Sequence, residues 1–434
     1  MTSDKRHLTV GGDWNALQIP YLASILIWTI SLASIFCMLL RPRRIEEAYW
    51  IDAGAALLVV TGLIPFREAV FAVSEGLDVY LFLTGMMVLA ELAREEHVFD
   101  WAAALAAGHA RKSPRRLFTL VYIVGAIVTA LLSNDATAVV LTPAVLAVVR
   151  RARVDPKPYL LACAFIANAA SFVFPISNPA NLVVFNARIP PLLSWLSIFL
   201  VPSLASILAT YLCLVWMFRK QLRGEIQGEV ESVPLSAEGK LAVAGLLLSA
   251  GALIASSALG LSLGAPTLGA AVLVLGVVAS RNHSLVVRVA KGVSWAVLPL
   301  VAGLFVIVEA LKNAGLLRAG LAGLKSLDPM PAWIAKDVSA FAVAFISNGM
   351  NNLPVGLMSR AAIQHAQQSG IVAHAMAIGV DLGPNLSITG SLATILWLIA
   401  LRREKVEITA WEFLKFGVVA MPVALLASLL VLRS

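Results

Sequence analysis

Residues 133–143 of the chain read SNDATAVVLTP and place one aspartate, Asp135, inside an otherwise uncharged stretch, residues 117–149. A stretch of this length can enter a lipid bilayer, where an ionised carboxylate costs about 2.5–3.5 kcal/mol on insertion scales. Asp135 is therefore a candidate functional residue, with a helix-capping aspartate at the membrane surface as the alternative. A second uncharged polar stretch, SNGMNNLP at residues 347–354, weakens that alternative because the feature occurs twice.

The composition predicts a helical membrane protein. Of the 434 residues, 59% are hydrophobic and only 13% are charged, whereas soluble domains carry about 25% charged residues. Apolar runs such as residues 21–40 and 241–259 are continuous, which is typical of spanning helices and not of barrel strands. The net charge of +8 comes from Lys and Arg in short loops, which orient a membrane protein and do not indicate nucleic-acid binding. We expect an all-α polytopic protein of the lipid bilayer.

The chain divides into two halves with the same plan. Each half has three apolar spans, a short arm, a re-entrant helical hairpin with a polar tip, a broken transmembrane helix and a final span. The prolines at 175 and 179, with polar residues between them, are expected to unwind the first broken helix. The total is about ten spans plus two hairpins. The predicted segments are a polar N-terminal tail (1–16), a first repeat (17–220, with a hairpin at about 116–150 and a broken helix at about 158–187), a cytoplasmic linker (221–238) and a second repeat (239–434, with a hairpin at about 332–360 and a broken helix at about 371–401).

Basic clusters orient the two halves in opposite directions. Arg and Lys residues flank both ends of the first hairpin, so these ends are expected in the cytoplasm. The flanks of the second hairpin contain Lys336, Asp337 and Arg360; they are less basic and are expected outside. The crossings then count consistently, both termini fall outside, and the two repeats are inverted. Inverted repeats with broken helices are typical of secondary transporters, whose substrate site lies near the membrane midplane.

Three motifs resemble those of the arsenite/antimonite efflux permeases (the ArsB type) of the ion transporter superfamily. They are SNGMNNLP at 347–354, GVDLGPNLSITGSLATILW at 379–397 and NDATAVVLTP at 134–143. The similarity extends from about residue 17 to residue 431. It implies export of trivalent arsenic and antimony hydroxides in exchange for protons across a bacterial inner membrane, with a mobile transport domain moving against a scaffold. It also implies a possible separate arsenical-stimulated ATPase as a partner.

The polar residues of the breaks suit such a substrate. Arsenite is the neutral triol As(OH)3 at neutral pH, so its site needs hydrogen-bond donors and acceptors and no fixed positive charge. The four broken segments contain no Lys or Arg, which argues against a carboxylate or sulfate substrate, although helix N-termini alone can hold an anion. Alternatively, these side chains only satisfy unwound backbone. The candidate substrate-binding residues are Asn134, Thr137, Ser177, Asn178, Asn181, Ser347, Asn348, Asn351, Asn352, Asn385, Ser387, Thr389 and Ser391, and Asn168 lies ten residues before Asn178.

Asp135 and Asp381 are the only acidic residues in the broken segments, and both are candidate proton-coupling residues. Structural capping of broken helix ends is the alternative. Glu91 and Glu309 fall near span ends and are expected at the surface or against an arm, with a role in coupling as the alternative. His365 and His374 are expected in a loop beyond the second hairpin.

Other function classes are less well supported by the residues. They show neither a metal-ligand spacing nor a nucleophile–base constellation, so we expect no cofactor, no metal and no enzymatic activity. A sodium-coupled anion transporter or a Na+/H+ antiporter of the same superfamily is the alternative within transport. A membrane-embedded enzyme or a channel is the alternative outside it.

Overall fold

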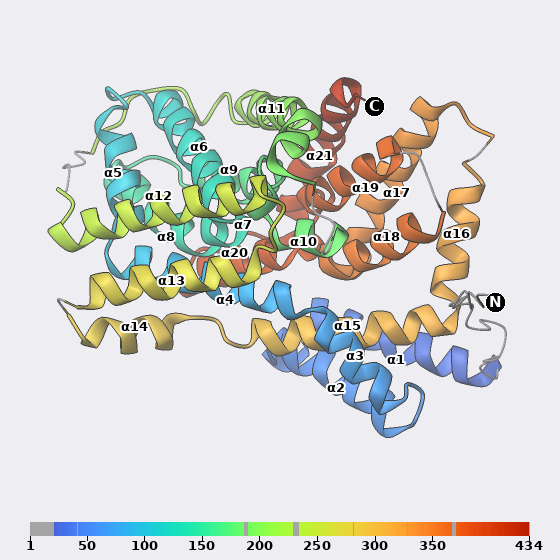
Figure 1. The fold of residues 1–434 in the computed structure, drawn as a ribbon. Coiled ribbons are helices and arrows are strands. Elements are labelled where there is room, and N and C mark those ends of the chain that lie inside the picture. Colours follow the sequence, from blue (N-terminus) through green and yellow to red (C-terminus); the bar gives the residue numbers. More distant parts are fainter. Residues whose placement is uncertain are drawn as a thin grey trace, which may run out of the picture.

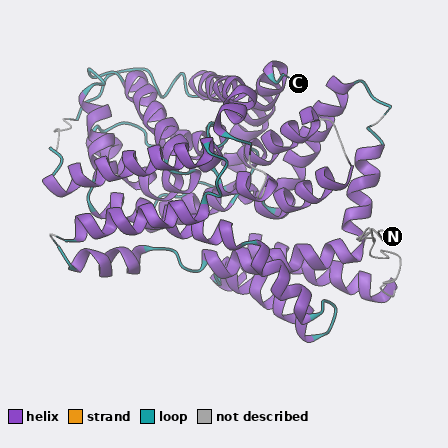
Figure 2. Ribbon diagram, in the orientation of Figure 1, coloured by secondary structure: helices purple, strands orange, loops and turns teal. Residues whose placement is uncertain are grey.

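The computed structural model describes residues 21–40, 42–185, 190–228, 234–280, 282–327, 329–366 and 370–433. The predicted polar tail, residues 1–16, lies outside these ranges. Within them every regular element is a helix (Figure 2), which confirms the all-α expectation.

The helices follow one another in the same order in the two halves (Figure 1). The first half contains α1 (Tyr21–Leu40), the short η1 (Pro42–Arg44), α2 (Glu47–Val60), α3 (Phe66–Glu75), α4 (Leu77–Glu95), α5 (Val98–Gly108), α6 (Pro114–Leu131), α7 (Asn134–Ala136), the π-helical η2 (Thr137–Leu141), α8 (Thr142–Arg151), α9 (Lys157–Ala169), η3 (Pro175–Ser177), α10 (Pro179–Phe185) and α11 (Leu192–Met217). The second half contains α12 (Ala237–Ala258), α13 (Gly264–Ala279), α14 (Ser284–Gly292), α15 (Val297–Leu311), the π-helical η5 (Lys312–Leu316), α16 (Leu317–Lys325), α17 (Ala332–Met350), α18 (Asn352–Ala366), α19 (Gly370–Leu382), η6 (Gly383–Asn385), η7 (Ile388–Gly390), α20 (Leu392–Arg403) and α21 (Ala410–Val431).

Five helices in the described residues are long and apolar enough to cross a membrane, or six when the bent pair α3 and α4 counts as one span. The bend between α3 and α4 is 49°. Most of the other expected crossings fall on helices that are shorter, such as α13, or interrupted by a break, such as α9 with α10.

The elements separate into two groups that meet in the middle of the molecule. In Figure 1, α6, α9, α11, α17, α19 and α21 lie in the upper part, and α1–α4 with α13–α15 lie in the lower part. The labels of α7, α10 and α20 lie between them. These central elements are the restarts of the interrupted helices, so the breaks lie at the centre of the fold.

Apolar contacts bind the two halves to each other inside the upper group. The rings of Phe165 on α9 and Phe413 on α21 stack with centroids 4.9 Å apart, and Trp397 on α20 meets Phe413 edge-on at 5.8 Å. Trp397 Nε1 also donates to the carbonyl of Leu160 at 3.1 Å. Buried aromatic pairs contribute about 0.5–1.5 kcal/mol beyond their buried area. The broken helices of the two halves are therefore fixed against each other.

Small residues bring α17 close to α19 and to the break that follows it. A Cβ added at Gly379 of α19 would collide with the backbone of Ala340 on α17, and one added at Gly383, the first residue of η6, would collide with that of Ala344. Such small-residue pairs, four apart on each helix, allow the backbones of membrane helices to approach closely. The crossing places the end of α17 beside the break that follows α19.

Candidate functional site

The first helix interruption places Asn134 and Asp135 in a new first turn. The chain leaves α6 at Leu131, and Ser133 is extended, with φ −173° and ψ 165°. Ser133 Oγ accepts a hydrogen bond from the Ala136 N–H at 3.1 Å. A serine at this position is a typical N-cap, and an acidic residue in the first turn interacts favourably with the helix dipole.

The second interruption reaches the same arrangement by a different backbone. After α17, Asn351 has φ 75° and ψ 151°, a region that non-glycine residues rarely adopt. Its Oδ1 accepts from the Leu353 N–H at 3.3 Å, and α18 begins at Asn352. Asn352 and Leu353 therefore occupy the first-turn positions that Asn134 and Asp135 occupy in the first half.

The two broken helices also restart alike. Asn178 precedes α10, and its Oδ1 accepts from the Ala180 N–H at 3.0 Å. Ser391 precedes α20, and its Oγ accepts from the Thr394 N–H at 3.1 Å. Both are polar residues that cap the restarted half of a broken helix.

Each restart contacts the broken helix of the other half. Asn178 Nδ2 donates to Asp381 Oδ1, and Ser391 Oγ lies 3.5 Å from Asn168 Oδ1, a long hydrogen bond. Asn168 and Asp381 stand ten residues before Asn178 and Ser391, respectively. The second oxygen of Asp381, Oδ2, accepts no hydrogen bond from the described residues, although the side chain is fully buried. The two crossed contacts are thus equivalent in position but differ in chemistry, because one contains a carboxylate and the other an amide.

The four helix starts line one central cavity. Each helix start contributes its first residues to the cavity wall. Leu83 of α4 and Val297 of α15 complete the wall. The volume of this cavity that a water molecule can occupy is about 10 Å³, enough for about one water. Among the described residues that line it, Asp135 is the only ionisable one. The residues from the helix starts are Asn134, Asp135, Asn178, Pro179, Asn352, Leu353, Ser391, Leu392 and Ala393.

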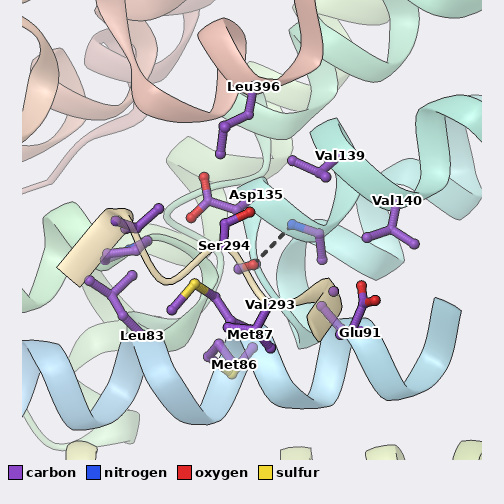
Figure 3. Close-up of a pocket in the computed structure, with 16 residues that line it drawn as sticks. Leu83, Met86, Met87, Glu91, Asp135, Val139, Val140, Val293, Ser294 and Leu396 are labelled. Atoms are coloured by element: carbon purple, nitrogen blue, oxygen red, sulfur yellow. Dashed lines mark hydrogen bonds between the residues drawn. The ribbon is translucent and has the colours of Figure 1, made fainter. Parts of the chain in front are cut away.

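A second cavity adjoins the first and shares Asp135 with it (Figure 3). Its water-sized space is about 70 Å³. Leu83, Met86, Met87 and Glu91 follow α4 along the bottom of the view, and Asp135 lies above them. Glu91 is only 7% exposed, so of its two expected locations, the surface and a position against an arm, the surface was wrong.

The predicted substrate-binding residues fall into three sets. Asn134, Asn178, Asn352 and Ser391 line the central cavity. Three others form a clasp between the end of α17 and the second break: Ser387 Oγ donates to Asn348 Oδ1 at 2.6 Å, and Thr389 Oγ1 donates to the Asn348 carbonyl at 2.8 Å. The remaining six bond within their own segments or to a neighbouring helix and line neither cavity; they are Thr137, Ser177, Asn181, Ser347, Asn351 and Asn385.

The two proton-coupling candidates, Asp135 and Asp381, occupy different environments. Asp135 faces both cavities, whereas Asp381 lies behind Asn178 and lines neither of them. The two aspartates are linked through Asn178, which lines the central cavity and binds Asp381. They therefore share one polar cluster but not one cavity wall.

Some features were not expected from the sequence. Thr394 is buried beside Ser391, with 2.8 Å between the hydroxyl oxygens; its only signal was its place three residues after a capping serine. Lys336 and Arg360, the predicted flanks of the second hairpin, lie in α17 and α18, and only their partners were not expected. Lys336 Nζ donates to the Leu429 carbonyl at 2.5 Å, and Arg360 pairs with Glu75 of α3 at 3.1 Å.

His374 also departs from expectation. It lies in α19 and not in a loop, and its ring meets Phe199 edge-on with centroids 5.5 Å apart. His365 lies within α18. Among the described residues, no three His, Cys, Asp or Glu side chains are grouped so that they could hold a metal ion.

Comparison with known proteins gives the family. Residues 20–380 match the CitMHS family, described as citrate transporters. The chain belongs to this family. Its relatives include the arsenical pump membrane proteins of Escherichia coli strain K12 and of Yersinia enterocolitica, each 28% identical over 409 residues, or 91% of this chain and 95% and 94% of theirs. An uncharacterized transporter of Mycobacterium tuberculosis strain H37Rv is 28% identical over 435 residues, covering 94% of this chain and 98% of that protein.

A solved structure supports the fold of this family member. The YdaH transporter of Alcanivorax borkumensis aligns with a TM-score of 0.56 and 14% identity, over 85% of this chain and 87% of that one. The chain is thus a polytopic membrane transporter, not an enzyme, and it resembles the arsenical pumps. The similarity to bacterial pump proteins implies a plasma-membrane location.

Proposed function

We propose that the protein exports arsenite and antimonite, as the neutral hydroxides As(OH)3 and Sb(OH)3, across the inner membrane in exchange for protons. The observation that carries the proposal is the central cavity, which four helix starts line with amides, a hydroxyl and one carboxylate. Asn134 Oδ1 is buried without a hydrogen-bond partner among the described residues, so it is free to accept from a substrate hydroxyl. The amide N–H groups can in turn donate to the substrate oxygens.

The proposed architecture is a pair of inverted repeats. Each contributes one re-entrant hairpin, α6–α8 or α17–α18, and five crossings. The ten crossings are α1, α2, α3–α4, α9–α10 and α11 in the first repeat and α12, α13, α14–α15, α19–α20 and α21 in the second. The matching order of elements in the two halves supports this assignment, and so do the crossed contacts between the breaks.

Movement of the cavity walls is required, because a space for about one water cannot hold a trihydroxide. The rings of Phe118 on α6 and Tyr159 on α9 pack with centroids 5.9 Å apart, so the first hairpin is bound to its broken helix. Asn348 on α17 accepts hydrogen bonds from the second break, which binds the second hairpin to its broken helix. Leu83 and Val297, in contrast, present only apolar side chains to the cavity. Sliding past those two residues breaks no hydrogen bond at the cavity wall. We therefore propose an elevator-type cycle in which the hairpins and broken helices move as one body against α4 and α15.

Protons would enter this cycle at Asp135 or Asp381. An ionised carboxylate that crosses the barrier without a partner is disfavoured, so the empty carrier returns in its protonated form. Protonation from outside then favours release of the hydroxide there, and loss of the proton inside restores the site. Because the substrate is neutral, each cycle moves net positive charge inward.

A sodium-coupled anion transporter, or a Na+/H+ antiporter, is the second candidate. The description of the family as citrate transporters favours the anion, and so do four helix starts that direct N–H groups at one cavity. Citrate carries three carboxylates, however, and Asp135 would repel them. Among the described residues, no Lys or Arg lines the central cavity to compensate.

Flux into everted membrane vesicles separates the candidates. We expect an acid-inside pH gradient without sodium to drive uptake of arsenite and antimonite but not of citrate or phosphate. Asp135→Asn and Asp381→Asn should each abolish this uptake while the protein remains folded. Uptake of citrate that requires sodium, or normal arsenite uptake in both variants, would overturn the proposal. If a separate ATPase drove export instead, uptake would require ATP and that partner.

A further inference from the structure

The cavity in Figure 3 connects Asp135 to a second carboxylate, that of Glu91 near the end of α4. Asp135 and Glu91 are the only ionisable residues among the described residues that line it. Leu83 lines both cavities and Glu91 follows it eight residues later on the same helix, about 12 Å along the axis. One face of α4 therefore runs from the central cavity to Glu91.

The far end of this cavity carries a chain of ion pairs. Glu91 accepts from Arg94 through both oxygens, at 2.8 Å from Nε and 2.5 Å from Nη2. Arg94 is about half exposed and also pairs with Glu95 at 2.6 Å, and Glu95 pairs with Arg288 of α14 at 2.6 Å. Lys291, an exposed residue of α14, is the next charged residue along that helix. Glu91 is thus the buried first member of a series that ends at the surface.

The basic clusters place that surface on the cytoplasmic side. A basic cluster follows α4 and α5 closely in the chain: Arg111, Lys112, Arg115 and Arg116. Short loops rich in Arg and Lys face the cytoplasm, so we place this end of α4 there. A proton that leaves Asp135 for the cytoplasm must cross the cavity between the two carboxylates. About 70 Å³ of water-sized space holds a few waters, enough for a short hydrogen-bonded chain.

We propose that Glu91 is the proton-exit residue: it receives the proton from Asp135 through waters in this cavity and passes it to the cytoplasm. This inference rests on the proposed proton exchange. In the step, the O–H bond of protonated Asp135 breaks, an O–H bond forms on the Glu91 carboxylate, and the proton is then lost to bulk water. While Glu91 is neutral, Arg94 keeps an anionic partner in Glu95, so no cation is left unpaired.

Gly292 supports a close fit around Glu91. A Cβ added at Gly292 would overlap the Glu91 carboxylate, so the C-terminal end of α14 packs directly against that carboxylate. Gly292→Ala should push the carboxylate out of its place without removing it. Gly276→Ala on α13 is the matched control, because a Cβ there meets open space.

The test compares two fluxes in everted vesicles. Net arsenite uptake driven by a pH gradient requires proton release to the bulk in every cycle, whereas arsenite–arsenite exchange at equal pH does not. We expect Glu91→Gln to reduce net uptake at least tenfold and to leave exchange within twofold of wild type. Glu91→Asp should restore part of net uptake, and Gly292→Ala should resemble Glu91→Gln more weakly.

Glu309→Gln is the control for loss of a glutamate, because Glu309 pairs with Lys312 at 2.6 Å in the corresponding place of the second half and lines neither cavity. It should leave both fluxes within twofold. Equal loss of both fluxes in Glu91→Gln, or loss of neither, overturns the role of Glu91. If the wild type shows no proton-driven arsenite uptake, the proposed function itself fails, and this outcome is distinct from the other two.

Discussion

Asn134 and Asp135 at the start of α7, and Asn352 and Leu353 at the start of α18, line the same cavity from opposite halves of the chain. The asparagine occurs in both pairs, but the carboxylate of the first is replaced by an apolar side chain in the second. A substrate that forms the same hydrogen bonds with both halves needs the shared amides. A coupling ion that must be taken up and released needs a titrating group, and among the described residues only the first half supplies one at the cavity wall.

The crossed contacts repeat this difference with the halves exchanged. Asn178 binds the carboxylate of Asp381 in the second half, whereas Ser391 meets the amide of Asn168 in the first half. Each half therefore contributes one carboxylate to the polar cluster at the helix breaks. Asp135 lies at the cavity wall, whereas Asp381 lies behind Asn178. The comparison separates positions that build the cavity from positions that add charge to it.

The largest expected effect is that of removing the acid from the first half. Asp135→Asn makes the two helix starts alike in charge, and proton-driven arsenite uptake should fall to background because no proton acceptor remains at the cavity wall. The amide has the shape of the carboxylate, so folding should be retained, as thermal unfolding in detergent will show. Asp100→Asn on α5, where Asp100 is 54% exposed, is the control and should transport normally.

Adding a carboxylate at the start of α18 tests the same comparison between the two helix starts. Leu353→Asp places two carboxylates around a space for about one water, and like charges this close cannot both be ionised. We expect arsenite uptake at neutral pH to fall about tenfold, with a smaller loss for Leu353→Asn, which adds polarity without charge. Equal losses in the two variants would show that charge at this position does not matter.

The crossed contacts should differ in their contribution to stability. Asn178→Ala leaves the buried Asp381 carboxylate without its donor, which costs about 1–3 kcal/mol, whereas Ser391→Ala removes mainly a cap, which costs about 1 kcal/mol. Thermal unfolding of the two variants measures the difference. Combining Asn178→Ala with Asp381→Leu removes both partners and should recover much of the loss; a double variant as unstable as Asn178→Ala contradicts this account.

The smallest effect concerns the backbone before each helix start. Asn351→Gly relieves the conformation at φ 75° but loses the hydrogen bond from the Leu353 N–H, which costs only a few tenths of a kcal/mol, so it should raise the free energy of unfolding by about 1 kcal/mol. Ser133→Gly at the matching position replaces an N-cap in extended backbone and should lower it by a few tenths of a kcal/mol. If denaturation experiments showed that both variants change the free energy of unfolding in the same direction, the difference between the backbones at Asn351 and Ser133 would not have the effect we expect.

Much of the fold was predictable because breaks in membrane helices have strong local causes. The capping Ser133, the prolines at 175 and 179 and the polar run after Asp381 all interrupt helices where the sequence indicates. The helices α3 and α14 were not expected. Phe66–Glu75 and Ser284–Gly292 each carry charged residues in a short segment, so neither has the apolar length that identifies a span.

The side chains that face the cavity could be predicted only as part of a larger set. Asn178 and Asn181 are three residues apart in one polar segment, yet Asn178 faces the cavity while Asn181 donates to the Ser171 carbonyl at 2.9 Å. Which of them faces the cavity depends on how the second half packs against the first. The sequence pattern does not contain that information. For the same reason Glu91 was expected at the surface or against an arm, whereas it is buried and lines a cavity.

The most direct test of the central claim is a simultaneous measurement of arsenite and proton movement in sodium-free proteoliposomes of the purified protein under an imposed membrane potential. Exchange of a neutral hydroxide for protons moves net charge across the membrane. A potential alone should therefore drive protons toward the negative side and arsenite toward the positive side. Asp135→Asn should abolish both fluxes. Arsenite movement that ignores the potential, or that continues unchanged in Asp135→Asn, would contradict the account.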